Sequence, residues 1–160
     1  MDVLERFLND KDHYASRAIQ LGETCPYGKI ELTEDIADIG NLDVLVEIMR
    51  EEYQKHVMND DDVWNVSVLL GTLLGEMIIR EIDGHWEINE DELPVVKESS
   101  GNGLSPISKI LKIITSEEND EGSPSVFYEG YQALKRYHYM SDEEKETITT
   151  YIHTDKGGER

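Results

Sequence analysis

Side chains that commonly carry out chemistry are few in this chain, and their spacing matches no familiar active site. The histidines are scattered, with no HxxxH, HExxH or CxxC pattern to pair them for zinc; they are His13, His56, His85, His138 and His153. Cys25 is the one cysteine and stands beside Pro26 in a turn with no base nearby, so we expect it to be structural. We therefore predict a protein that is not an enzyme and that carries no cofactor.

Carboxylates are abundant, but their number makes any single pair uninformative about acid–base catalysis. A general acid or base needs a desolvated cleft, which a sequence does not reveal. The segment Glu117-x-Asn119-x-Glu121-Gly122 matches the first half of a calcium-binding loop. The twelfth position is Tyr128 instead of Glu, so we expect no metal there.

The charge balance indicates the class of partner. The chain has 35 Asp and Glu residues against 15 Lys and Arg, which gives a net charge of −20. Such a surface repels phosphate backbones and anionic lipid, so we expect direct binding to neither nucleic acid nor membranes. It favours a basic protein partner, mainly by accelerating encounter. The alternative is that the acidity only keeps the protein soluble.

Two acidic loops form the docking surface that the sequence predicts. The set consists of one aromatic side chain, as an anchor, and eight carboxylates: Trp86, Glu87, Glu90, Asp91, Glu92, Glu117, Glu118, Asp120 and Glu121. If the two loops converge, they focus one negative field on a basic protein. The alternative is that they are solvated turns at opposite ends of the molecule.

A non-catalytic inhibitor that binds a basic protein is the function that these features favour. The most concrete form is an immunity protein that neutralises a basic bacterial toxin. Other possibilities are a phage-type anti-defence protein or DNA mimic, a small-ligand or enzymatic domain with an unrecognised site, and an oligomerising module. Clustering of the acids in loops counts against a DNA mimic, which needs a regular array.

Length and hydrophobic patterning predict one acidic domain over residues 1–154 and a disordered tail over 155–160. The N-terminus lacks the pattern of a signal peptide, and the longest apolar stretch, 66–79, is interrupted by polar residues. We therefore expect a cytoplasmic protein. The fold class is α+β and predominantly helical, with five to six helices around a central apolar helix at about 60–82 and one small β-hairpin at about 85–98.

The central helix is expected because apolar residues occupy nearly all of its sides between Val63 and Ile82. Leu70, Leu74 and Ile78 should be almost fully buried. Gly71 and Gly75 lie four residues apart, and each costs a helix interior about 1 kcal/mol relative to Ala. We expect close approach by another element along this face.

Helices are also predicted over 2–20 and from Asn41 to about Met58, and after the Ser-Pro pairs at 105–106 and 123–124. A last helix is expected from Ser141, with Glu144 completing a capping box, through Ile152.

One resemblance spans residues 69–131. It rests on a helix motif, an aromatic strand position and Pro-headed segments: Leu70-Gly71-x-x-Leu74-Gly75-Glu76, Trp86, Pro94, Pro106-Ile107, Lys109-Ile110 and Phe127-Tyr128. This order resembles small bacterial domains of unknown function with an LGxxLGE/D-type helix, a Trp-bearing strand pair and a Pro-headed helix. The hairpin here is abbreviated, and Ile110 replaces a second basic residue. The resemblance implies a fold but no activity, because such families carry no assigned one.

Overall fold

The computed structural model describes residues 2–138, 141–144 and 146–147. Its elements in chain order are α1 (Val3–Glu23), η1 (Ile36–Asp38), α2 (Ile39–Gln54), α3 (Asp60–Glu81), β1 (Gly84–Ile88), β2 (Pro94–Glu98), β3 (Gly103–Leu104), α4 (Pro106–Thr115) and α5 (Pro124–His138). The contacts divide the chain into residues 1–127 and residues 128–160. The first unit contains every element up to the start of α5, and the second begins within α5.

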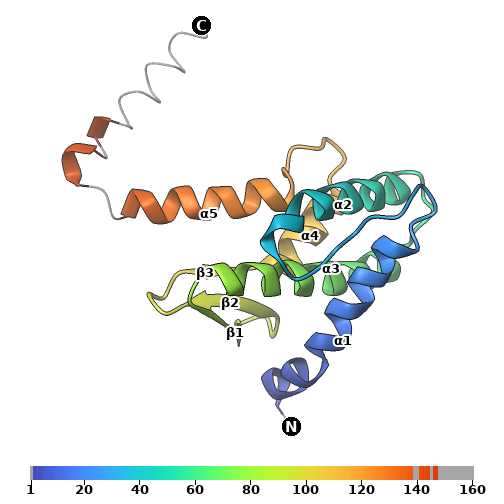
Figure 1. Cartoon of the computed structure of the whole chain (residues 1–160), viewed down its shortest axis with the longest axis horizontal. Helices are drawn as coiled ribbons and strands as arrows, with labels where there is room; N and C mark the ends of the chain where they lie inside the picture. Colours follow the sequence, from blue (N-terminus) through green and yellow to red (C-terminus); the bar gives the residue numbers. More distant parts are fainter. Residues whose placement is uncertain (1, 139–140, 145, 148–160) are drawn as a thin grey trace, which may run out of the picture. The chain divides into compact units, whose positions relative to one another are not determined.

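Helix α3 is the centre of the first unit, as its all-round apolar pattern predicts. It packs on α1, α2, α4 and the sheet (Figure 1). Leu70, Leu74 and Ile78 are fully buried, which confirms the expected core. By length and composition α3 is apolar enough to cross a membrane, but 61% of the qualifying window is buried inside the fold. Such burial is consistent with the core helix of a soluble protein.

Both glycines of α3 make the close contacts expected of them. A Cβ added at Gly71 would lie 2.5 Å from the Cα of Ile107, at the start of α4. A Cβ added at Gly75 would lie 2.2 Å from the indole of Trp86 on β1. The glycines therefore set how deeply α4 and the sheet pack on the central helix.

The predicted hairpin is confirmed and carries one additional strand. In β1 and β2, which are antiparallel, Trp86 lies opposite Val96 and Ile88 opposite Pro94. The two-residue strand β3 then pairs with β2 and makes β2 the middle strand. Pro94 is the first residue of β2, a position where its missing N–H does not interrupt the ladder.

Helix α2 begins and ends earlier than the sequence predicts. It starts at Ile39 instead of Asn41, whose side-chain amide donates to the carbonyl of Glu31. It ends at Gln54, because His56 takes a left-handed conformation with φ 61°. The N–H of His56 donates to the carbonyl of Tyr53, and that of Val57 donates to the carbonyl of Glu52. This is a Schellman arrangement, which closes a helix and turns the chain sharply.

Three acids follow that turn in the first turn of α3. The side chain of Asn59 accepts from the N–H of Asp62, and the Asp62 carboxylate accepts from the N–H of Asn59. This reciprocal capping box fixes the start of α3. Near the other end of the chain, Ser141 and Glu144 also make capping contacts. Residues 142–144 and 146–147 are helical, whereas residues 145 and 148–152 of the helix predicted there, and the tail at 155–160, lie outside the described residues.

Candidate functional site

Trp86 does not lie on the surface, so it does not fit its expected role as the anchor of a docking surface. Only 6% of the residue is exposed. Its ring packs edge-on against Phe7, with the centroids 4.8 Å apart, and lies over Gly75. The alternation of apolar and polar residues in β1 correctly places Trp86 on one face of the strand, but that face points into the core.

The two predicted acidic loops do not converge. In Figure 1 the hairpin of β1 and β2 lies below α3, whereas the connection between α4 and α5 lies above it. Glu90, Asp91 and Glu92 are exposed at the hairpin turn, and Glu87 contacts the imidazole of His85 at 2.6 Å. The arrangement agrees with the alternative of separate solvated turns.

Within the second loop the four acids differ in their contacts. Glu121 forms an ion pair with Lys109 of α4, at 3.1 Å, and Asp120 accepts a hydrogen bond from Ser116. Glu117 and Glu118 are exposed.

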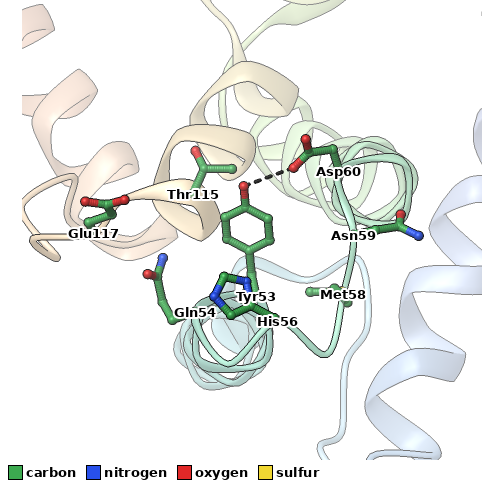
Figure 2. Close-up of a pocket in the computed structure, with 8 residues that line it drawn as sticks. All are labelled: Tyr53, Gln54, His56, Met58, Asn59, Asp60, Thr115 and Glu117. Carbon is green, nitrogen blue, oxygen red and sulfur yellow. Dashed lines mark hydrogen bonds between the residues drawn. The ribbon is translucent and has the colours of Figure 1, made fainter.

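Glu117 instead shares a pocket with the connection between α2 and α3. We call this the carboxylate pocket; its volume is about 490 Å³. Figure 2 shows its lining, which comes from the end of α2, the start of α3 and the end of α4: Tyr53, Gln54, His56, Met58, Asn59, Asp60, Thr115 and Glu117. The Tyr53 hydroxyl donates to Asp60 at 3.0 Å. Two carboxylates from distant parts of the sequence thus border one concave surface.

Most polar groups of the carboxylate pocket already have structural partners. The amide of Gln54 donates to the carbonyl of Ser116 at 3.2 Å, and the hydroxyl of Thr115 donates to the carbonyl of Leu111 at 2.8 Å. Asn59 is used in the capping box of α3. A nucleophile beside an oriented base is the minimum for covalent catalysis, and the lining supplies no such pair.

The potential in the carboxylate pocket favours a cation. Helices α2 and α4 both end here, and a helix C-terminus carries about half a negative charge. At the start of α3, Asp60 and its two acidic neighbours offset the positive end of that helix. Arg50, whose side chain is 12% exposed, compensates the end of α4 by donating to the carbonyls of Ser116 and Glu117. The carboxylates of Asp60 and Glu117 have no ion-pair partner among the described residues.

Each of the two tyrosines near this connection donates a hydrogen bond to its own carboxylate. The hydrogen bond to Asp60, followed by the charge of Asp60 and smaller contributions, raises the pKa of Tyr53. The hydrogen bond from Tyr27 to Glu52, at 2.7 Å, is the main reason that the pKa of Tyr27 is also raised. Negative charge disfavours a phenolate and favours a cation at the same place.

A second, apolar pocket adjoins the first and shares Met58 with it. We call it the apolar pocket; its volume is about 220 Å³, and its lining comes from the end of α1, the turn after it and α2: Leu21, Thr24, Cys25, Pro26, Tyr27, Ile48, Met49, Glu52 and Met58. Tyr27 and Val57, which flank the two pockets, are 69% and 64% exposed. Large apolar side chains are therefore open to solvent next to a cation-favouring pocket.

Another group of carboxylates lies between α1, α3 and the loop before η1. Oxygens of Asp12, Glu34 and Glu76 lie within 4.8 Å of one another, a spacing that a divalent cation can bridge. Two basic side chains already occupy this network: Lys11 is 2.5 Å from Glu76, and Arg80 is 2.6 Å from Glu34. The group acts first as an ion-pair network that ties α1 and the loop to α3.

Burial lowers the pKa of Lys11, but the hydrogen bonds to Glu76 and Asp12 outweigh it and raise the pKa above 10.5. Glu76 is only 8% exposed, and Lys11 is the partner that makes this burial tolerable.

The sequence predictions missed the contribution of Asp60 to a site. The acids at 60–62 are explained by helix capping, and capping is confirmed. Their proximity to Glu117 depends on how α4 packs between α2 and α3, which no local pattern contains. One signal in the sequence points to both residues: Asp60 lies at the predicted start of one helix and Glu117 just after the predicted end of another. Unsatisfied backbone groups at helix ends attract polar side chains.

Comparisons with protein-family models, with curated proteins and with solved structures gave no match to the chain. The resemblance to small bacterial domains therefore stays a prediction.

Proposed function

We propose that this protein is a non-catalytic binding protein for a basic protein partner, as an immunity protein that neutralises a basic bacterial toxin would be. The observation that supports this proposal is a set of exposed carboxylates in the two segments that border the carboxylate pocket: Asp60, Asp61, Asp62, Glu117, Glu118 and Asp120. We call this set the acidic face. None of its members forms an ion pair with another described residue.

Carboxylates without an ion-pair partner support this function for a physical reason. Like charges held together raise the free energy of the isolated protein, and a basic partner relieves that repulsion. Elsewhere in the described residues, several acids are already neutralised by Lys11, Arg80 and Lys109. The acidic face keeps its charge, and two of its carboxylates, Asp60 and Glu117, also border a pocket that a partner could enter.

The test is the association rate with a candidate basic toxin, measured by stopped flow at low and high salt. The triple variant Glu117→Gln, Glu118→Gln, Asp120→Asn removes three charges from the acidic face. We expect association about threefold to tenfold slower at low salt, with the difference nearly lost at high salt.

A matched control is the triple variant Glu90→Gln, Asp91→Asn, Glu92→Gln at the hairpin turn, which removes the same three charges. Its association rate should change much less. Equal slowing in both variants would mean that only net charge matters and that the acidic face is not the docking surface. Association that is absent, or insensitive to salt, would contradict binding of a basic partner.

A further inference from the structure

We infer that the carboxylate pocket and the apolar pocket together take one basic, amphipathic segment of the partner, with an Arg or Lys side chain in the first and an apolar side chain in the second. The inference rests on the proposed function and specifies its partner chemistry. Met58 lies between the two positions, because it lines both pockets.

The carboxylate pocket suits a cationic side chain by geometry as well as charge. Asp60, at the start of α3, and Glu117, two residues after the end of α4, both line it (Figure 2). The ring of Tyr53 forms part of the wall, and an aromatic ring attracts a cation placed over its face. A guanidinium or ammonium group would neutralise charge here, since the two carboxylates have no cationic partner among the described residues.

The apolar pocket provides the hydrophobic part of the recognition. Leu21, Ile48 and Met49 line it together with Met58. Methionine side chains are flexible and polarizable, so they adapt to apolar groups of different shape. The exposed Val57 and Tyr27 extend this apolar surface outward. A partner that covers them gains about 25 cal/mol for each Å² of apolar area removed from water.

The backbone between the two pockets is held in place before any partner arrives. The Schellman arrangement at His56 fixes its first half, and the capping box at Asn59 fixes its second half. Arg50 and Gln54 hold the end of α4 at Ser116, which lies between Thr115 and Glu117. Such preorganisation lowers the entropy that binding must overcome.

The charge argues for a different protein as the occupant instead of a second copy of this chain. A second copy also has a net charge of −20, and two acidic faces repel each other. A basic segment is attracted, and apolar side chains among its basic residues match the paired pockets.

The experiment uses the full chain with ¹³C-methyl-labelled methionine and short synthetic peptides that carry one Arg and one Leu in a Gly-Ser background. The separation of Arg and Leu is varied. Binding should shift the methyl signals of Met58 and Met49, while the signal of Met77, which is fully buried, stays unchanged. One separation should bind best, because the two pockets are at a fixed distance.

Three variants assign the binding to its pockets. Asp60→Asn with Glu117→Gln should weaken the peptide about tenfold, the loss expected for hydrogen bonds to charged groups. Asp91→Asn with Glu92→Gln makes the same charge change at the hairpin and should have little effect. Met58→Ala should weaken Arg–Leu peptides more than peptides in which Ser replaces Leu.

Two outcomes would overturn the inference while leaving the proposed function standing: equal weakening by both charge variants, or binding that shifts neither Met58 nor Met49. Peptides in which Glu replaces Arg must not bind. If Glu-containing peptides bind equally well, the occupant is not cationic and the inference is wrong. If the partner protein itself associates at a rate that does not depend on salt, both this inference and the proposed function are wrong.

Discussion

Substituting Gly75 by Ala tests whether the sheet packs on α3 by direct contact. The added Cβ would lie 2.2 Å from Cη2 and 2.4 Å from Cζ2 of Trp86. Ordinary contact starts at 3.4 Å, so the indole must retreat by about 1.2 Å. Retreat is restricted, because the ring packs edge-on against Phe7 and lies in a strand that β2 holds in register.

The magnitude follows from two opposing effects. Alanine is favoured over glycine in a helix interior by about 1 kcal/mol. Overpacking of a filled core costs about 1–3 kcal/mol, and a rigid indole places this site at the upper end. We therefore expect Gly75→Ala to lower the free energy of unfolding by about 2 kcal/mol. Gly71→Ala should cost more, because its added Cβ meets the backbone of Ile107.

Urea unfolding followed by far-ultraviolet circular dichroism measures these differences. Gly40→Ala is the control, because a Cβ at this position of α2 meets nothing within 4 Å. It should leave stability unchanged or raise it by up to about 1 kcal/mol. If Gly75→Ala is as stable as the wild-type protein, or gains like Gly40→Ala, the close-contact argument is refuted.

A double-mutant cycle with Trp86→Phe adds an independent check. Phenylalanine removes the part of the indole that the new Cβ would meet. The double variant Gly75→Ala, Trp86→Phe should lose less stability than the sum of the two single changes, by about 1 kcal/mol. Strict additivity would mean that the two side chains do not touch.

Two further predictions concern the core and the ion pair beside it. Leu74→Ala should lower the free energy of unfolding by about 2–5 kcal/mol in the same denaturation assay, because it leaves a cavity at a fully buried position; a loss below about 1 kcal/mol would show that α3 is not central. The raised pKa of Lys11 predicts that the protein is less stable at alkaline pH. The stability that the charged Lys11 contributes is fully present below pH 10.5 and is lost as the pH rises through the folded-state pKa. Lys11→Arg, whose charge persists, should retain stability in that range if it still reaches Glu76.

The sequence predicted those parts of the fold that local patterns determine. The apolar residues of α3, its Asp-rich first turn and the Ser105-Pro106 pair before α4 all identify helix boundaries within a few residues. Side-chain alternation around Trp86 predicted β1 correctly. The third strand escaped prediction because two residues, Gly103 and Leu104, contain too short a pattern to recognise.

The candidate site was harder to predict because it depends on tertiary packing. The charge of Glu117 makes it a candidate from the sequence, but Asp60, which lines the same pocket, comes from a segment 57 positions earlier in the chain. Aromatic side chains often anchor interfaces, but the same apolar area makes them good core residues, and Trp86 lies in the core. The net charge led only to the hypothesis of a basic partner, whereas the position of a docking surface requires coordinates.

The two glycine contacts of α3 also restrict how this sequence can change during evolution. Position 71 faces backbone atoms of Ile107, so no replacement of a neighbouring side chain can make room for a larger residue there. Position 75 faces a side chain, and a chain that enlarges it can compensate by shrinking residue 86. Descendants of a common ancestor should therefore keep glycine at 71 while positions 75 and 86 covary. That contrast provides a means of recognising distant relatives whose overall identity has faded.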